Sequence, residues 1–533
     1  MPKERPVISS AKSVAICTFV SRITGMLRDM LIVQAFGAGL VLDSFFYAFQ
    51  IPHLFRRLFG EGALAAAFVP TFTGALETEG RPAAEKLLAR TLALLTVTLA
   101  VIVVLLEAIL VTFWAFSSDN PDRQLMLALT ALMLPFMLTI CIVALFSSIL
   151  NCLHSFVPAA LIPTVLNVVM IIGVVRVGPL MSSQPEVQVF GLAISVLVAG
   201  VIQLLMLLYV LRRMGISLGW SFQPRDEKVR RMIQLMLPVM LGQGVLLLSV
   251  FLDTQICAFL APGVNAFGAD FPYPLDVGAL STLTVAQRLY QFPLGVLGVS
   301  LAIAAFPTFS RLAAREDWQQ WSHEVAGSLR LAVFAGFLTG GVMIVLAEPI
   351  VQLLFEYRNF SATDTARSAR VLMFYGFGMW AFCAWHIVLR GFYSLGDVRT
   401  PVKISCTMVP INLALSLVLI WFEGIREAAF AISTVTTSTL SVLVGLLWLR
   451  KRAEHAIVTS RTIRAGIVML GITLVTAAAT YWAHASWYAP LASIVPNQVL
   501  LRGIDTFGAL ALGCVHSSSA LPPHSNCPKP ACY

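Results

Sequence analysis

The sequence has little charge: Asp, Glu, Lys and Arg make up only 12% of its 533 residues, while 58% are hydrophobic. Soluble domains carry about a quarter charged residues, and soluble monomers tolerate exposed apolar patches of roughly a few hundred Å². The shortage of charge therefore excludes a soluble globular protein and a disordered chain.

Cysteine is scarce as well. The chain has nine Cys, and most of them lie inside apolar runs, where cysteine behaves as a small hydrophobic residue. This pattern excludes a secreted disulfide scaffold. Strict alternation of apolar and polar residues is also missing, because the apolar runs are continuous, and this excludes a transmembrane β-barrel.

These exclusions leave an all-α polytopic membrane protein. A crossing helix needs roughly 20 mostly apolar residues. Thirteen stretches meet this requirement. A fourteenth candidate, 498–513, is too short for a full span, so we predict 13–14 spans. The first segment contains charges and is too long for a cleaved signal peptide. The thirteen predicted spans lie near residues 12–38, 42–75, 88–116, 124–151, 157–178, 188–211, 232–260, 277–310, 326–355, 367–394, 400–422, 427–449 and 463–485.

Lys and Arg are distributed unevenly between alternate loops. If the N-terminus is placed inside, the cytoplasmic segments hold 21 of these residues and the opposite loops hold six. Because cytoplasmic loops of membrane proteins carry an excess of Lys and Arg, the bias predicts a cytoplasmic N-terminus. The same bias accounts for the net charge of +9, because the basic residues set the topology and are attracted to anionic lipid. No nucleic-acid partner is therefore expected.

The chain contains an internal repeat. Residues 67–72, A-F-V-P-T-F, recur as A-F-P-T-F at 305–309, and Pro158 and Asn167 recur as Pro401 and Asn412. Six spans separate the copies, so the repeats have the same orientation, which is a transporter architecture with a central cavity. We predict two six-helix lobes at 1–215 and 216–455, extra helices at 456–513 and an atypical tail at 514–533.

When the arginines of loops and span ends are set aside, five remain well inside predicted spans, namely Arg22, Arg28, Arg56, Arg57 and Arg288. An arginine near the middle of a bilayer costs at least about 2.5–3.5 kcal/mol, so such residues face a watery cavity or a partner. One interpretation is structural pairing, for example between Arg57 and Glu61 four residues later. The arginines outnumber the nearby acids, however, and arginine fits phosphate oxygens in a bidentate way. The excess favours a phosphate or diphosphate ligand.

Pro and Gly interrupt the spans close to these arginines. Ile51-Pro52 and Gly60-Glu61-Gly62 break the second span, and F-P-L-G at 292–295 breaks the eighth. Broken helices at membrane depth are tolerated where they line a cavity or pack on protein. Paired breaks in the two halves indicate a substrate site between the lobes, and simple kinking for packing is the alternative.

Several motifs resemble those of the MurJ (MviN) lipid II flippases. The opening S-R-x-x-G-x-x-R-D pattern of that family is matched by S-R-I-T-G-M-L-R-D at 21–29. Further matches are D-S-F-F-Y-A-F at 43–49, I-P-H-L-F-R-R-L-F-G-E-G-A at 51–63, Q-R-L-Y-Q-F-P-L-G-V at 287–296 and F-Y-S-L-G-D-V-R-T-P at 392–401. The resemblance extends over about residues 10–485.

The resemblance implies a member of the multidrug/oligosaccharidyl-lipid/polysaccharide exporter superfamily. Such a protein moves lipid II, the undecaprenyl-diphosphate-linked peptidoglycan precursor, to the outer leaflet of the bacterial inner membrane by alternating access. It would serve cell-wall synthesis and cell shape, with lipid II, membrane lipids and other cell-wall synthesis and division proteins as partners. It would be a transporter, not an enzyme, with no cofactor or metal and with the membrane potential as driving force.

Site residues carry over from the same motifs. The substrate-binding arginines of the family match Arg22, Arg28, Arg56 and Arg288, which would hold the diphosphate. The essential acid of the second helix matches Asp43, which would help to operate an outward gate through a pair with arginine; Asp29 and Glu61 are the further gating or essential acids. The extra helices match 463–485 and 498–513 and would form a groove for the polyprenyl tail.

The sequence also departs from the family pattern. Gln50 and Gln287 stand where some members carry charged residues, which leaves the arginines less compensated. The sodium site of some members needs acids in spans seven and eleven, and only Asp253 is one. The eleventh span offers Asn412 and Ser416, so Asp253 and Asn412 make only a weak candidate cation site.

The last twenty residues differ in composition from the rest. They contain a C-x4-C spacing, which is weak evidence for a metal, and four prolines after Gly513. We expect this tail to be a truncated or out-of-frame end to the fourteenth helix, which puts the groove in question.

Other functions remain open at this point. An exporter of drugs or of another polyprenyl-linked oligosaccharide in the same superfamily would lack the S-R…R-D and R-R-L-F-G-E-G patterns. A membrane enzyme acting on polyprenyl phosphates usually needs clustered acids for Mg²⁺, and the acids of the cytoplasmic loops are scattered. A scaffold without transport would not need arginines inside the membrane.

Overall fold

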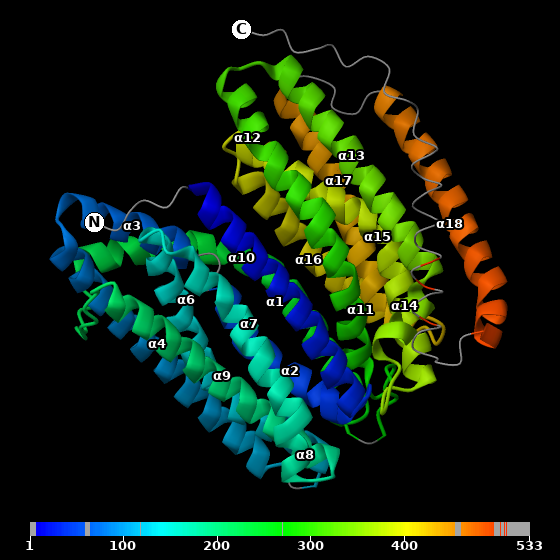
Figure 1. Ribbon diagram of the computed structural model, residues 1–533, viewed down its shortest axis with the longest axis horizontal. Helices are drawn as coiled ribbons and strands as arrows, with labels where there is room; N and C mark the ends of the chain where they lie inside the picture. The colour runs from blue at the N-terminus through cyan, green and yellow to red at the C-terminus, as the bar shows by residue number, and fades with distance from the viewer. Residues whose placement is uncertain are drawn as a thin grey trace. The chain divides into compact units, whose positions relative to one another are not determined.

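The computed structural model describes residues 7–58, 64–117, 119–268, 270–453 and 460–494, together with 502, 506 and 508. Every regular element in these residues is a helix (Figure 1). Glu61, the tail at 514–533 and nearly all of the candidate span 498–513 lie outside the described residues.

The described residues of the first half form nine α-helices, the π-helical segment η2 and a π turn at 56–58. The bounds are α1 Val7–Phe36, α2 Leu40–Phe55, α3 Leu64–Thr78, α4 Arg81–Ala115, α5 Pro121–Met133, α6 Phe136–Cys152, α7 Phe156–Ile172, η2 Gly173–Val177, α8 Gly178–Met181 and α9 Pro185–Arg213.

The second half begins with a long helix and ends with the last helix that the structure describes. The bounds are α10 Glu227–Phe259, α11 Ala279–Pro293, η3 Leu294–Val299, α12 Ser300–Ala314, α13 Trp318–Val345, α14 Ala347–Phe355, α15 Ala362–Ser394, α16 Arg399–Leu419, α17 Ala428–Ala453 and α18 Ser460–Ile494.

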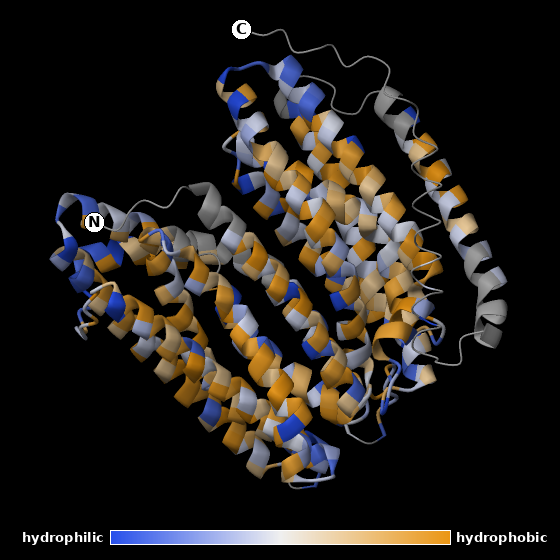
Figure 2. Cartoon of the chain, viewed as in Figure 1, coloured by the Kyte–Doolittle hydropathy of each residue, from blue (hydrophilic) through white to orange (hydrophobic). Residues whose placement is uncertain are grey.

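Nine helical segments in the described residues are long and apolar enough to cross a membrane, which confirms a multi-pass membrane protein. Figure 2 shows apolar residues along the helices, with hydrophilic residues gathered at helix ends and loops. The other four predicted spans, 12–38, 42–75, 232–260 and 463–485, are helical where described, as α1, α2 with α3, α10 and α18. That these four cross the membrane stays a prediction.

Two compact units make up the fold. Unit 1 contains residues 1–282, 357–361 and 420–426, and unit 2 contains 283–356, 362–419 and 427–533. Unit 1 includes α10, which packs with the N-terminal helices, and the lobes at 1–215 and 216–455 stay a prediction. Two side-chain contacts belong to this packing: Tyr47 of α2 donates a hydrogen bond to Gln255 of α10 (2.8 Å), and Lys228 of α10 contacts Glu79 (2.5 Å).

Each unit has its own core. In unit 1, stacked aromatic rings connect α2 to α6 through Phe45, Phe49 and Phe136. In unit 2, α13 and α15 approach closely through glycine. A Cβ atom at Gly340 would lie 2.3 Å from the backbone oxygen of Gly376, so only glycine fits there. Small residues at helix interfaces allow such close backbone packing in membrane proteins.

At the predicted break in the eighth span, the helix changes from α to π geometry but stays helical from Ala279 to Ala314. Helix α11 ends at Pro293, and the chain continues as the π-helical segment η3 before α12 begins at Ser300. Proline lacks the N–H of a regular helical turn, and π segments are frequent at functional sites. In the second span, Pro52 lies inside α2, and residues 56–58 form a π turn.

Candidate functional site

Arg28 is the most enclosed of the predicted arginines. It lies on α1 with 8% of its surface exposed, and Asp29 beside it has 9% exposed. Both Nε and Nη2 of Arg28 donate to Oδ1 of Asp29, at 2.9 and 2.6 Å. Its Nη1 donates to Oδ1 of Asn167 on α7, at 2.8 Å. A buried arginine held on two sides in this way has a fixed direction, as recognition of a charged group requires.

Asn167 connects this arginine to the rest of α1. Its Nδ2 donates to the backbone oxygen of Ser21 (3.0 Å) and to the hydroxyl of Thr24 (3.2 Å). Gly25 makes room for the amide, since a Cβ there would lie 3.3 Å from Nδ2. Asn167 is only 4% exposed. We call Arg28, Asp29 and Asn167 the arginine clamp. The sequence had marked Asn167 only as a repeat position.

Arg22 and Arg56 are in different surroundings. Arg22 lies six residues before Arg28 on α1 and is exposed. Arg56, at the C-terminal end of α2, is partly buried, and its Nη2 lies 3.4 Å from Nδ1 of His53. Arg57 follows in the same π turn. The structure thus places three predicted substrate arginines in unit 1, with one of them fully enclosed.

Arg288 belongs to unit 2, where it lies on α11 and is partly buried. Aromatic rings surround this part of the helix: Tyr290 stacks on Tyr375 of α15 at 4.3 Å and on Phe382 at 5.3 Å between ring centroids. Gln287 Nε2 contacts the hydroxyl of Tyr375 at 3.4 Å. These contacts hold the last turns of α11 just before the break at Pro293.

Asp43 holds the beginning of α11. Its Oδ2 accepts from the backbone N–H of Gly278 (2.9 Å), and its Oδ1 accepts from the backbone N–H and the hydroxyl of Ser281 (2.7 and 2.5 Å). A carboxylate at a helix N-terminus satisfies orphan N–H groups and matches the helix dipole. The partners that we describe for Asp43 are therefore a helix start and a hydroxyl. A pair with arginine stays a prediction.

The chain next to Asp43 is closely packed. Gly278 has a φ of +85°, and a Cβ there would lie 2.2 Å from the backbone oxygen of Ala38. Both the backbone angle and the space therefore require glycine. We call Asp43, Gly278 and Ser281 the helix latch.

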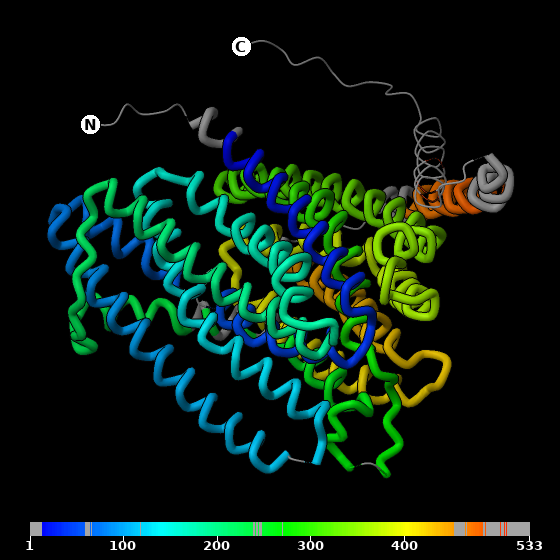
Figure 3. Tube along the Cα trace, turned by 60° about the horizontal axis from the view of Figure 1, so that its bottom comes forward, coloured from blue at the N-terminus to red at the C-terminus, as the bar shows by residue number. Residues whose placement is uncertain are grey.

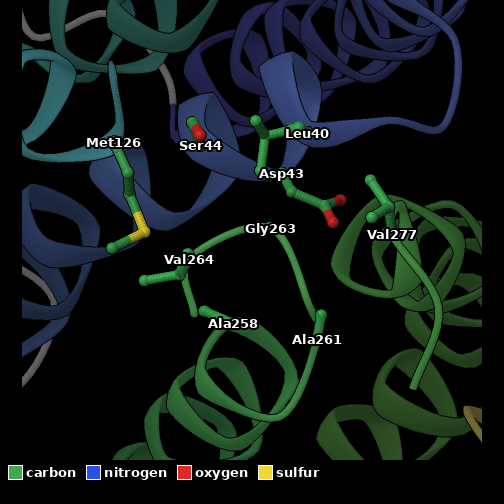
Figure 4. A pocket seen from close by; sticks show the side chains of 9 residues that line it. All are labelled: Leu40, Asp43, Ser44, Met126, Ala258, Ala261, Gly263, Val264 and Val277. Carbon is green, nitrogen blue, oxygen red and sulfur yellow. The ribbon is translucent and has the colours of Figure 1, made fainter. Parts of the chain in front are cut away.

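A small pocket opens beside the helix latch (Figure 4). It is lined by Asp43, by Ser44, whose hydroxyl is buried, and by apolar residues of α2, α5 and the segment after α10. The Asp43 carboxylate points toward Val277, on the side of the helix latch. The walls are otherwise apolar, so the pocket has little to attract a charged ligand.

Three loops of unit 1 gather around the same end of the unit. Asn359 donates through its Nδ2 to the backbone oxygen of Ala35 (2.5 Å) at the end of α1. Arg426 forms an ion pair with Asp276, just before the helix latch. Arg123 donates to the backbone oxygens of Val264 (2.9 Å) and Asn265 (2.5 Å) after α10. Polar contacts therefore join the loops at this end of unit 1, which is predicted to face outward.

The two members of the weak cation site lie in different units. Asp253 of α10 is in unit 1, 5% exposed, and its buried Oδ1 accepts no hydrogen bond from the described residues. Asn412 of α16 is in unit 2, where its Nδ2 lies 3.4 Å from the hydroxyls of Ser433, Thr434 and Thr437. Nothing among the described residues gathers three His, Cys, Asp or Glu side chains as a metal site would.

Similarity to known proteins extends over most of the chain. Residues 32–499 match the family model described as lipid II flippase MurJ. The lipid II flippase MurJ of Burkholderia cenocepacia is 31% identical over 479 residues, which is 87% of this chain and 88% of that protein. The matched range of the family model begins after Arg22 and Arg28. The assignment of these two arginines to the site therefore depends on the motif resemblance and on the contacts described here for Arg28.

Solved structures share the fold. A structure described as lipid II flippase MurJ in an inward closed conformation aligns with a TM-score of 0.72 at 21% identity, over 95% of this chain and 98% of that one. An inward-facing multidrug resistance MATE family transporter of the MOP superfamily aligns with a TM-score of 0.65 at 15% identity, over 81% of this chain and 94% of that one. The predicted superfamily fold is confirmed.

Proposed function

This chain belongs to the lipid II flippase MurJ family, and we propose that it carries lipid II from the cytoplasmic to the periplasmic leaflet by alternating access. Family membership makes it a membrane transporter whose substrate is lipid II. The relatives favour this substrate over the alternatives of drugs or other lipid-linked oligosaccharides in the same superfamily.

The arginine clamp is the observation that carries the proposal. Arg28 presents a fixed guanidinium in a predicted span, and the diphosphate of lipid II is the anion that such a fork binds in a bidentate way. We propose that diphosphate oxygens displace Asp29 from the guanidinium during transport, so that Arg28 exchanges one anionic partner for another. Arg22, Arg56 and Arg288 would supply the remaining positive charge.

The helix latch would serve as the outward gate. While Asp43 caps α11, the outward end of unit 1 stays closed by the contacts with Gly278 and Ser281. Opening requires the carboxylate to leave these N–H groups, and water can then solvate both partners. Asp43 would therefore act on the gate by capping a helix, and this role differs from the pair with arginine that the sequence predicted.

The membrane potential would drive the cycle. Moving one charge across it is worth about 2.3 kcal/mol per 100 mV. With an inside-negative potential, an anionic substrate is pushed outward, and an empty site rich in arginine is drawn back inward. This scheme places the N-terminus in the cytoplasm and the protein in the bacterial inner membrane, where other cell-wall synthesis and division proteins are expected partners.

Exposure of lipid II at the cell surface tests the proposal. Cells depleted of their own flippase receive either this chain or its Arg28→Lys variant, and surface lipid II is measured with a reagent that cannot enter the cell. We expect wild type to restore exposure. The variant should fail to do so while remaining in the membrane, because lysine keeps the positive charge but lacks the planar guanidinium that binds two oxygens at once.

Arg311→Lys is the matched control, since Arg311 is exposed at the end of α12. It should behave as wild type. Equal surface lipid II with Arg28→Lys and with wild type would reject the role of Arg28. No recovery with wild type would reject the function itself.

A further inference from the structure

The end of α9, the segment that follows it and the first turns of α10 carry a concentration of exposed positive charge. Its residues from Tyr209 to Arg231, which we call the linker strip, cross from one repeat to the next and are drawn in green after α9 in Figure 3. All five of its arginines are exposed, namely Arg212, Arg213, Arg225, Arg230 and Arg231.

The acids in and next to the linker strip have partners other than its five arginines, and Glu79 offsets only Lys228 of the strip. Asp226 pairs with Arg90 of α4 at 2.5 Å, and Glu79 pairs with Lys228 at 2.5 Å. Glu85 accepts hydrogen bonds from Arg81 (3.1 Å) and from Ser217. Of the acids in or next to the linker strip, only Glu227 stays exposed without an ion pair in the described part of the chain. The strip is therefore strongly positive.

Aromatic side chains are exposed along the same strip. Trp220 is 60% exposed, Phe222 is 51% exposed and Tyr209 is 57% exposed, and the guanidinium of Arg213 lies over the Tyr209 ring at 5.1 Å. Exposed rings of this size are costly in water, and Trp and Tyr are enriched where a membrane meets water, because each joins an apolar ring to one polar group.

Contacts with α4 fix the position of the linker strip along that helix. Arg81 donates to the backbone oxygen of Met214 (2.7 Å), and Arg90 holds Asp226. Arg90 is the last charged residue before an uninterrupted apolar run that reaches Glu107. The strip is thus tied to the helix turns where the apolar part of the span begins, which is the level of lipid headgroups.

We propose that the linker strip docks on the headgroups of anionic phospholipids. The arginines would bind the phosphates, and Trp220 and Phe222 would enter the interface between headgroups and acyl chains. Basic segments next to a membrane are attracted by its anionic lipids. The orientation proposed above makes this the cytoplasmic leaflet, but the binding itself does not depend on the flippase role.

Hydrogen–deuterium exchange of the full chain in nanodiscs tests the docking. The backbone amides of 214–226 are compared in phosphatidylcholine alone and in mixtures with rising phosphatidylglycerol. We expect phosphatidylglycerol to slow exchange in wild type, and high salt to reverse this, because salt screens exposed charges. Arg225→Gln should weaken the attraction by up to about fivefold, read as a higher phosphatidylglycerol fraction at half protection.

Two further variants distinguish the contribution of the strip's charges from that of its aromatic rings. Arg315→Gln, at an exposed arginine outside the strip, should leave the protection of 214–226 unchanged. The double variant Trp220→Ser with Phe222→Ser keeps all the charges and should reduce protection, which distinguishes insertion of the rings from charge alone.

Three outcomes would overturn the proposal. Exchange that is independent of phosphatidylglycerol in wild type would exclude docking on anionic lipid. Equal protection by inorganic diphosphate in pure phosphatidylcholine would indicate a soluble anion site in its place. An equal loss of protection with Arg315→Gln and with Arg225→Gln would indicate general electrostatics. None of these outcomes bears on lipid II transport, which is measured separately at the cell surface.

Discussion

Asn167 on α7 and Asn412 on α16 occupy repeat-related positions, yet their surroundings differ in charge. Both are 4% exposed. Asn167 accepts from a buried arginine and binds two oxygens of α1. In the described residues, the hydrogen bonds of Asn412 go to hydroxyls, and the neighbouring Ser416 bonds to Ser433 at 2.6 Å. Each half thus has a buried amide that joins two helices, and in the described part of the chain the amide of the first half also contacts a charged pair.

This difference distinguishes a polar cluster that only joins helices from one that also presents a charged group to a ligand. A neutral network of amide and hydroxyl groups joins two helices and offers nothing specific to an anion. The arginine clamp joins helices as well, and in addition it presents a guanidinium whose counter-ion can be exchanged. Substitutions at and around the two positions should therefore differ in what they damage, and four such substitutions test the difference.

Removing the counter-ion of Arg28 should have the largest effect. In Asp29→Ala the guanidinium stays buried without its carboxylate, and breaking a buried pair in this way costs about 3–5 kcal/mol. Thermal unfolding of the purified protein in nanodiscs measures the loss. An unfolding temperature equal to that of wild type would mean that Arg28 is solvated, and the clamp would then lose its structural role.

Asn167→Ala should have the next largest effect. It leaves the groups on α1 and on Arg28 with unmet hydrogen bonds, each costing about 1–3 kcal/mol if it stays dry. We expect both stability and transport to fall, since Arg28 loses its direction. Asn167→Gln, which keeps the amide, is the conservative control, and transport that stays normal in Asn167→Ala would contradict the orienting role.

Gly25→Ala should have a smaller effect on stability. The new Cβ would lie 3.3 Å from Asn167 Nδ2, so α7 must shift by a few tenths of an ångström. We expect about 1 kcal/mol or less from such crowding, visible as a lower unfolding temperature with reduced transport. Gly74→Ala, at a position with nothing near its Cβ, is the control, and an equal response in both variants would rule out a specific contact.

Asn412→Ala should have the smallest effect. Its Nδ2 contacts are long, at 3.4 Å, and a hydrogen bond between neutral groups contributes about 0.5–1.5 kcal/mol net. Transport of lipid II should remain near the wild-type rate in a vesicle assay without sodium. A loss as deep as that of Asn167→Ala would show that the two halves share one role, and the comparison would then fail.

Much of the architecture could be predicted from the pattern of residues. Continuous apolar runs place the helices, and Pro293 marks the break between α11 and η3 because proline removes a helical N–H. The partners of the site residues could not be predicted in the same way. The pair of Asp43 with an arginine stays a prediction, and the hydrogen bonds that its carboxylate accepts from Gly278 and Ser281 had no signal in the sequence.

Composition and residue spacing are enough to predict a helical membrane protein with an internal repeat and an excess of arginines inside its predicted spans, because apolar runs and charges act locally along the chain. That Arg28 is held by Asn167, and that Asp43 caps a helix more than 200 residues away, is known from the folded structure alone. Such contacts depend on how distant helices pack, and no local pattern specifies which distant polar groups come within about 3 Å of each other.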